Sequence, residues 1–348
     1  MKPMETQTQT IALHAAGTKL LAIQPEGEAW QALAVPANGE VSATIPDGPF
    51  TLVSVCDEPG LFNYYVTFGG TGDAELDVYC TDPASTVKVS LAAGSKGRAA
   101  IGSYPLFGEI TWYVKPGIYD VTAYDDSLTP PRFEIRRGVP IMVDTELAFD
   151  LATSGTPLEE IAVTAAALAA ETVSKRVRLH TAGGTRMTIP ATETGTRVWR
   201  VPASALQTGD RQTVTAIATT ASTSRTSTRA IPNTAVSAVL TLPAALASAS
   251  ATFGPPQRVT WESQGDWTQA YFSAADEDVT VLYDAFVTPN HVEQAGPLTS
   301  IELPAPASVP GWSSAWKIPS AAGLAWSLSL TRDLGNFDTE QVGRSGTF

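Results

Sequence analysis

Apolar and polar residues alternate with a period of two along most of the chain. Residues 51–55, 118–124 and 213–217 are examples. Because successive side chains of a β-strand point to opposite faces of a sheet, this alternation predicts strands with one buried and one solvated face. The 27 glycines and 25 prolines recur between such runs, as at residues 46–49 and 115–117, where tight turns need them. Helical periodicity is almost absent, so the pattern predicts an antiparallel all-β protein.

Two stretches of the first half share an ordered series of landmarks. The landmarks are Gly39-Glu40-Val41, Phe50 and Glu75-Leu76 in the first stretch, and Gly108-Glu109-Ile110, Tyr119 and Glu146-Leu147 in the second. Each stretch also contains a turn with proline and glycine before its aromatic residue. We therefore expect residues 39–82 and 108–152 to be two copies of one unit, with Phe50 and Tyr119 on equivalent strands.

The run Pro116-Gly117-Ile118-Tyr119-Asp120-Val121-Thr122-Ala123 resembles the strand signature of carboxypeptidase-regulatory-like (prealbumin-like) sandwich repeats. In those repeats a Pro-Gly or Ala-Gly turn leads an aromatic residue into the core and a strand follows. The resemblance covers about residues 39–152. It implies small seven-stranded sandwiches, common in exported and surface proteins, with no catalytic residues. The first copy departs from the signature by having Asp47-Gly48-Pro49 at the turn.

A chain of 348 residues is long enough for two to four domains of about 100 residues each. We expect tandem antiparallel β-sandwich domains of Ig-like or prealbumin-like type. Residues 1–82 form the first and residues 83–152 its repeat. Residues 153–246 form an arginine-rich sandwich after a short linker, and residues 247–348 form a distinct tryptophan-rich β domain.

Residues 156–170 are ambiguous between helix and strand. Thr156, Pro157 and Glu159 could cap and start a helix, and an alanine-rich stretch follows. Residues 86–93 begin in a similar way and alternate as a strand does. We therefore predict a strand at the start of the third segment as well.

Charge is unevenly distributed over a formal net charge of −13. Residues 1–152 carry −10, residues 153–246 carry +4 and residues 247–348 carry −7. The overall sign argues against nucleic acid and anionic lipid as partners. The arginines of the basic segment are Arg176, Arg178, Arg186, Arg197, Arg200, Arg211, Arg225 and Arg229. They form either a solvated face or a docking surface for the acidic neighbours or for a second copy of the chain.

Cys56 and Cys80 are the two cysteines of the chain, and each lies near the end of a predicted strand. They could be buried thiols, but we favour a disulfide, because no metal or redox motif accompanies them. A disulfide implies a periplasmic, cell-surface or secreted protein. Residues 1–5 lack the form of a signal peptide, so we expect the signal to be absent from this sequence. No apolar run approaches the ~18 residues that a transmembrane helix needs.

Motifs for catalysis or for cofactor binding are lacking. The three histidines are far apart in sequence, and neither a Gly-x-Ser-x-Gly elbow nor a glycine-rich phosphate loop occurs. Acidic clusters at residues 57–58, 125–126 and 276–278 could offer oxygen ligands to calcium, but none has the spacing of a calcium loop. We therefore predict no catalytic residue, cofactor or metal.

Tryptophans provide the one candidate binding feature. Trp30, Trp112 and Trp199 fall one in each earlier segment, which suggests one core tryptophan in each sandwich. In the last segment, Trp312 and Trp316 either pack in the core or form an exposed platform for sugar rings or a partner.

Three functions follow from these observations. The leading hypothesis is a non-catalytic exported or envelope-associated protein for structure, adhesion or protein docking. The alternative is a carbohydrate-binding accessory protein that uses the C-terminal aromatic residues. A glycoside hydrolase with spatially assembled carboxylates is a third class, without a supporting motif. The protein or glycan partner is not identified by the sequence.

Overall fold

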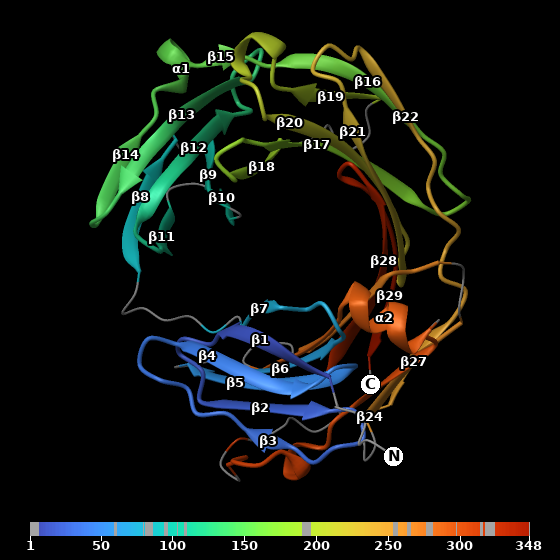
Figure 1. Cartoon of the computed structure of the whole chain (residues 1–348). Coiled ribbons are helices and arrows are strands. Elements are labelled where there is room, and N and C mark those ends of the chain that lie inside the picture. Colours follow the sequence, from blue (N-terminus) through green and yellow to red (C-terminus); the bar gives the residue numbers. More distant parts are fainter. Residues whose placement is uncertain are drawn as a thin grey trace.

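The computed structural model confirms the all-β class, with about 60% of residues in strands and 6% in helices. It describes residues 7–58, 61–78, 80, 86–93, 97–102, 104–107, 110–189, 196–252, 257–262, 266–275, 281–296, 298–313, 316 and 324–347. The chain bends into a C-shaped body around a central opening (Figure 1). The Ig-like tandem arrangement is not confirmed, because one long sheet contains strands of the first, third and C-terminal segments.

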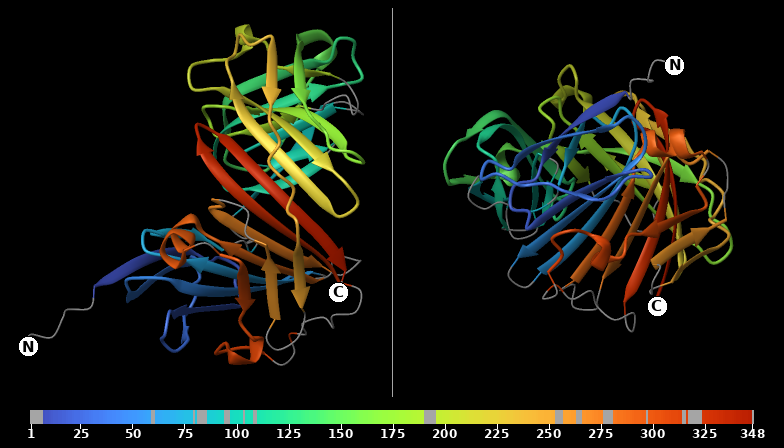
Figure 2. Two further views of the ribbon diagram at one scale, coloured as in Figure 1. Left: turned by 90° about the vertical axis from the view of Figure 1, so that its right-hand side faces the viewer. Right: turned by 60° about the horizontal axis from the view of Figure 1, so that its bottom comes forward.

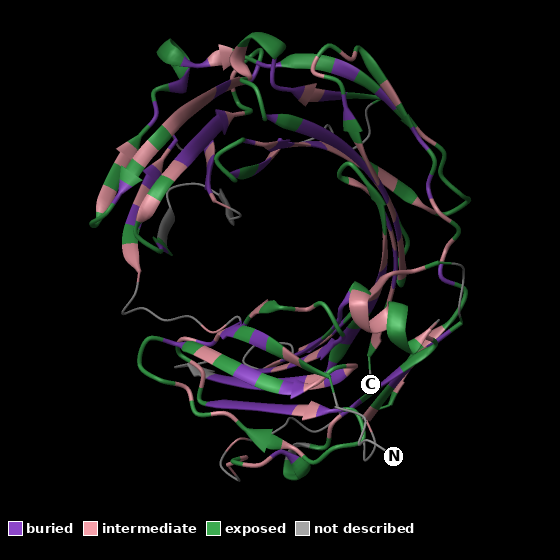
Figure 3. Cartoon of the chain, in the orientation of Figure 1, coloured by how far each residue is buried: buried purple, intermediate pink, exposed green. Residues whose placement is uncertain are grey.

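The first sandwich packs a short sheet on a longer one. The short sheet has the order β4 (Glu40–Pro46), β1 (Thr8–His14), β7 (Glu75–Asp77), and the longer one contains β3 (Gln31–Ala32), β2 (Leu20–Pro25), β5 (Phe50–Glu58) and β6 (Leu61–Gly69). Alternation along β1 buries Ile11 and Leu13 against Ile23 and Leu52 of the longer sheet. Figure 3 shows this alternation as bands of buried and exposed residues along the strands.

The second sandwich repeats the strand order of the first. Its strands are β8 (Val87–Ala92), β9 (Gly97–Ile101), β10 (Tyr104–Phe107), β11 (Ile110–Val114), β12 (Gly117–Asp125), β13 (Arg132–Ile141) and β14 (Thr145–Ala148). In both sandwiches the first strand pairs antiparallel with the fourth and parallel with the seventh. Phe50 and Tyr119 both lie on the fifth strand of their sandwich.

The third sandwich is a further copy of this topology, which the sequence landmarks do not indicate. Its strands are β16 (Glu159–Ala165), β17 (Thr172–His180), β18 (Arg186–Ile189), β19 (Arg197–Arg200), β20 (Arg211–Thr219), β21 (Thr223–Ile231) and β22 (Ser237–Leu240). Again the first strand pairs antiparallel with the fourth and parallel with the seventh. The strand predicted at the start of this segment is confirmed by β16. The linker before it holds α1 (Leu151–Ser154) and β15 (Thr156–Pro157), and the 3-10 turn η2 (Ala203–Ala205) follows β19.

The C-terminal segment has a different topology. A short antiparallel sheet contains β23 (Ala249–Thr252), β24 (Gln257–Trp261) and β27 (Ser300–Leu303). It covers β25 (Gln269–Ala275), β26 (Val281–Val287), β28 (Ala325–Gly335) and β29 (Asp338–Thr347). The segment also contains α2 (Pro289–Ala295), capped by the Thr288 hydroxyl, and the 3-10 turn η3 (Pro306–Ser308).

One twelve-stranded sheet connects the first, third and C-terminal segments. Its order is β18-β17-β20-β21-β29-β28-β25-β26-β6-β5-β2-β3. Strand β26 pairs parallel with β6, and β29 pairs antiparallel with β21. Figure 2 shows β28 and β29, in red, between the yellow strands of the third sandwich and the orange strands of the C-terminal segment. Separate tandem sandwiches would not share a sheet in this way, because each would keep its own edge strands.

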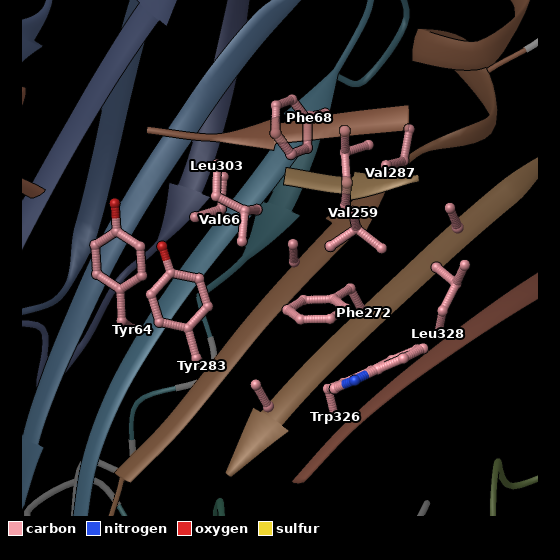
Figure 4. Packing of buried hydrophobic residues seen from close by; sticks show 14 of the residues in the cluster. Tyr64, Val66, Phe68, Val259, Phe272, Tyr283, Val287, Leu303, Trp326 and Leu328 are labelled. Atoms are coloured by element: carbon pink, nitrogen blue, oxygen red, sulfur yellow. The ribbon is translucent and has the colours of Figure 1, made fainter. Parts of the chain in front are cut away.

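The cores also cross segment boundaries. Tyr64 and Val66 of β6 pack with Phe272, Tyr283 and Trp326 of the C-terminal segment, as Figure 4 shows. A second core joins residues of the second and third sandwiches, including Tyr124, Phe133, Val177 and Val214. Because apolar burial is the main favourable term in folding, these shared cores hold the segments in one arrangement.

Candidate functional site

The candidate site lies where the short sheet of the first sandwich ends and the longer sheet continues beyond it. The short sheet ends at β7, whereas the long sheet below it continues past β6 into β26 and β25. The face of β6, β26 and β25 that looks toward the centre of the molecule therefore extends beyond the strand that would cover it. Figure 1 shows β7 on the side of the first sandwich that faces the central opening.

Strand β7 has a free edge. The Ala74 carbonyl oxygen accepts from the Ala12 amide at 2.9 Å, and the Val78 amide donates to the His14 carbonyl oxygen at 3.0 Å. In a parallel pair, alternate residues bond to the same neighbour, so the backbone groups of Glu75 and Asp77 point away from β1. No strand of the described chain pairs with that edge. An additional strand could pair with it.

The space beside β7 is a cleft of about 590 Å³, which we call the β7 cleft. Its lining residues are Leu52, Ser54, Tyr65, Val66, Thr67, Glu75, Leu76, Asp77, Val78, Tyr271, Asp284 and Phe286. Tyr271 and Phe286 are directly opposite each other on β25 and β26, and their side chains are 41% and 37% exposed. A cleft of this size with a mostly apolar lining and a few polar groups is typical of a binding site.

Asp284 is the buried charge of the β7 cleft. It is 7% exposed, and the Tyr271 hydroxyl donates to its Oδ1 at 2.8 Å. Burial raises the pKa of this carboxyl group above its usual value, although the hydroxyls of Ser273 and Tyr271 act in the opposite direction. A carboxyl group with a raised pKa in a cleft is characteristic of functional sites.

We expect Asp284→Asn to stabilise the protein at neutral pH by on the order of 1 kcal/mol. The folded-state pKa of Asp284 lies above the unfolded value, so the ionised form carries a cost that is present above the folded pKa. As the pH falls through that pKa, Asp284 takes up a proton and the difference between the two proteins should shrink. Urea unfolding at pH 7 and pH 4 measures it. An unchanged difference at pH 4 would show that the charge is not responsible.

The rim of the β7 cleft is acidic. His14 on β1 lies 2.8 Å from a Glu40 oxygen and 2.7 Å from a Glu75 oxygen. The hydrogen bond to Glu75 is the largest effect that raises the pKa of His14, and Glu40 adds to it. No cationic side chain of the described chain lies within 4.0 Å of the Asp77 carboxylate. The rim therefore favours ligands with positive charge near Asp77.

The predicted pair Trp312 and Trp316 lies on the opposite face of β6. Their ring centroids are 5.4 Å apart with an interplanar angle of 81°, an edge-to-face arrangement. Trp312 also packs edge-to-face on Phe62 and Tyr64. Both tryptophans are half-buried against the core shared with the C-terminal segment. This geometry gives a packed aromatic cluster and no pair of parallel exposed ring faces.

The remaining tryptophans also contribute to packing. Trp261 and Trp326 are buried, and Trp30, Trp199 and Trp267 pack against cores while partly exposed. The side chain of Trp112 lies outside the described residues.

Cys56 and Cys80 form a disulfide, with Cα atoms 5.4 Å apart. The bond joins β5 to the residue that follows the end of β7 by three positions, and the Thr18 hydroxyl donates to the Cys80 sulfur. The chain is therefore covalently fixed beside the β7 cleft. Of the acidic clusters considered for calcium, residues 276–278 and the side chains of residues 57–58 lie outside the described residues. Among the described side chains, no group of three or more histidine, cysteine, aspartate or glutamate residues is arranged so that it could hold a metal ion.

The arginines of the third segment divide into two sets. Arg197, Arg200, Arg225 and Arg229 form ion pairs with Glu160, Glu159, Glu171 and Glu340 respectively. Glu340 belongs to the acidic C-terminal segment. The Arg229–Glu340 ion pair is therefore a contact between the basic segment and an acidic neighbour. Arg176, Arg178, Arg186 and Arg211 have no carboxylate within 4.0 Å among the described residues. Self-association through this segment stays a prediction.

No protein-family model matches the chain, and no curated protein matches it either. In the part of the chain that the structure describes, no helix is long and apolar enough to cross a membrane.

The residues of the β7 cleft could not be found from the sequence. They come from residues 52–78 and 271–286, which only the pairing of β6 with β26 brings together. A weak signal exists in the alternation of Tyr271 and Ser273 with buried Phe272 and Ala274, which assigns them to the other face of β25.

Proposed function

We propose that the protein is an exported, non-catalytic docking protein that binds an extended segment of a partner polypeptide as an additional strand beside β7. The observation that carries this proposal is the free edge of β7 next to an uncovered part of the long sheet. Strand addition is a common mode of peptide recognition, in which backbone hydrogen bonds supply affinity and pockets for alternate side chains supply specificity.

The β7 cleft supports the same occupant. A strand beside β7 would lie about 4.8 Å from it, over Tyr65, Asp284 and Phe286. Alternate side chains of that strand would point at this floor, where an apolar or aromatic group fits the exposed rings. The acidic rim and Asp284 favour lysine or arginine in the partner segment. We infer a partner segment with apolar and basic side chains.

The disulfide supports both the site and the location. It holds the chain that follows β7 against β5, so the edge is presented by a restrained strand. Disulfides persist in oxidising compartments, which supports a periplasmic, cell-surface or secreted protein.

Binding of an eight-residue peptide that alternates lysine with leucine tests strand addition. We expect the wild-type protein to bind it, and the same peptide with alternate backbone amides N-methylated to bind at least tenfold more weakly by calorimetry. The effect follows because methylation removes backbone donors and leaves the side chains unchanged.

The matched variants are Asp77→Asn and Asp77→Pro. The first removes the charge, and the second also removes an amide that points away from β1, a position that tolerates proline at a sheet edge. We expect Asp77→Pro to weaken peptide binding roughly tenfold beyond Asp77→Asn, with unfolding midpoints of both near that of the wild type. Equal affinities for the two variants would rule out pairing at this edge.

Glycan binding is a second candidate, favoured by the exposed side chains of Tyr271 and Phe286. Flat aromatic faces beside hydrogen-bonding carboxylates suit sugar rings, and the rings of these residues replace the tryptophan pair as the platform. Affinity electrophoresis in gels with soluble cellulose or chitin derivatives separates the two functions. Glycan binding would be abolished by Tyr271→Ala and unaffected by Asp77→Pro, whereas strand addition is sensitive to Asp77→Pro.

A further inference from the structure

We propose that a second pocket, formed by β17, β18, β20 and the β28–β29 turn, binds a small ligand that carries a phosphate or sulfate group. This pocket has a volume of about 520 Å³ and is independent of the β7 cleft. Its lining residues are Arg178, His180, Arg186, Arg211, Thr213, Thr228, Asp333, Asn336, Phe337 and Thr339.

The strand register gathers the cationic side chains on one face. His180 of β17 is opposite Arg186 of β18 and opposite Arg211 of β20, so three adjacent strands place these side chains in one row. Arg178 lies two residues before His180 and therefore on the same face. The face is the one that continues through β29, β28 and β25 toward the β7 cleft.

The arginines of this pocket have no carboxylate partner among the described residues. No carboxylate of the described chain lies within 4.0 Å of Arg178, Arg186 or Arg211, whereas four other arginines of the segment are paired. Arg176, on the same face before Arg178, has a buried Nε without a hydrogen-bond partner among the described residues. Like charges gathered in one row repel each other, and a bound oxyanion would relieve that repulsion.

The shifted pKa values of His180 and Arg178 agree with a cluster of like charges in this pocket. Burial lowers the pKa of His180 to about 4, and the charges of Arg178 and Arg186 add to the effect. Burial and the neighbouring Arg176 and Arg186 likewise lower the pKa of Arg178. His180 is therefore neutral at pH 7, and its Nε2 lies 3.3 Å from the Thr213 hydroxyl.

The β28–β29 turn supplies an aromatic wall. Asn336 and Phe337 have φ angles of +53° and +67°, the left-handed conformation of a two-residue type I′ hairpin. A bulky residue rarely adopts this conformation, and such strain often accompanies function. The Phe337 ring centroid lies 5.2 Å from that of His180, and the Arg211 guanidinium is 5.0 Å from the Phe337 centroid.

Charge and size define the ligand class. A carboxylate offers two oxygens in one plane, whereas a phosphate or sulfate group offers additional oxygens in a tetrahedral arrangement to the arginine forks and threonine hydroxyls. The pocket has room for an organic body as well as the anionic group. Asp333 also lines the pocket, so the anionic group belongs on the β17–β18–β20 side, away from that carboxylate.

Calorimetric titration with two probes tests the site and distinguishes the sources of the anion. The probes are pyrophosphate and a sulfated heparin-derived disaccharide, each titrated into the full chain in low salt. We expect at least one to bind, with affinity that falls as salt rises, and the stronger probe identifies phosphate or sulfate as the natural group. No heat from either probe at millimolar concentration would overturn the proposal.

Arg186→Gln and Arg211→Gln are the test variants, since both side chains are exposed and their loss should leave the fold intact. Each should weaken the bound probe roughly tenfold or more. Arg197→Gln is the matched control, an exposed arginine of the same segment that is paired with Glu160 outside the pocket. A similar weakening in all three variants would reveal non-specific attraction and refute the site. Asp77→Pro should leave probe binding unchanged, which separates this test from that of the β7 cleft.

Discussion

Asp210→Ala should lower the free energy of unfolding by about 3–5 kcal/mol. The Asp210 side chain is fully buried and lies where the second and third sandwiches meet. Arg137 of β13 donates to it at 2.6 Å and 3.1 Å, and the backbone amides of Ala182 and Gln207 donate to it at 2.9 Å each. The variant leaves the two amides and Arg137 Nη2 without this acceptor.

Asp120 is a second carboxylate partner of Arg137 at the junction of the two sandwiches. Its carboxylate accepts from Arg137 at 3.0 Å and from the Gly138 and Gly183 amides. A Cβ atom on Gly183 would lie 2.6 Å from the Asp120 side chain, so glycine is required for this approach. In Asp210→Ala, Arg137 keeps one of its two carboxylate partners, so the loss should be large without abolishing folding.

Glu160→Ala is the control for this prediction. Glu160 forms an ion pair with Arg197 at 2.9 Å, but the two side chains are 40% and 66% exposed. An exposed pair contributes at most about 1 kcal/mol, so the control should change the urea midpoint little. Asp210→Asn should fall between the two, since it keeps one acceptor oxygen. If Asp210→Ala and Glu160→Ala had the same effect, the buried junction would not hold the sandwiches together.

Reduction of the Cys56–Cys80 bond should cost about 3 kcal/mol of stability. The bond closes a loop over a sequence separation of 24, and its loss restores conformational freedom to the unfolded chain. Thiol titration of the denatured, unreduced protein should find no free thiol. Two free thiols would exclude the bond and remove its support for an exported protein.

The double variant Cys56→Ala/Cys80→Ala provides the control for the reductant. Its unfolding midpoint should lie near that of the reduced wild-type protein and should not respond to the reductant. We also expect both forms without the bond to bind the lysine-leucine peptide more weakly, because the residues after β7 are then no longer tied to β5.

Local pattern was sufficient to predict that the fold consists mainly of strands. The period-two alternation predicted strands because a strand with one face on a core needs every second side chain to be apolar. The landmarks around Phe50 and Tyr119 predicted the first two sandwiches, and both residues lie on equivalent strands. The ambiguous start of the third segment was predicted as strand, in agreement with β16. The resemblance to carboxypeptidase-regulatory-like repeats stays an expectation.

The third copy shows a limit of repeat analysis. The topology of β16–β22 matches that of the first two sandwiches, yet the segment lacks their glycine-glutamate and aromatic landmarks. Burial needs apolar side chains of suitable volume at the inward positions, and many residue combinations meet that need. A sandwich can therefore keep the same strand topology without the sequence landmarks of the first two copies.

The sequence by itself thus determined the strand class and the cysteine pair that can bond. The tertiary structure alone decided which edges meet, and with them both candidate pockets. Strand β6 pairs with β26 across more than half of the chain, and β21 pairs with β29. The hydrogen bonds of such pairs come from backbone amides and carbonyls, which are the same in nearly every residue. The sequence of a strand therefore predicts that it will pair, but it does not predict with which edge. Tyr65 and Asp284 become neighbours only when β6 has paired with β26.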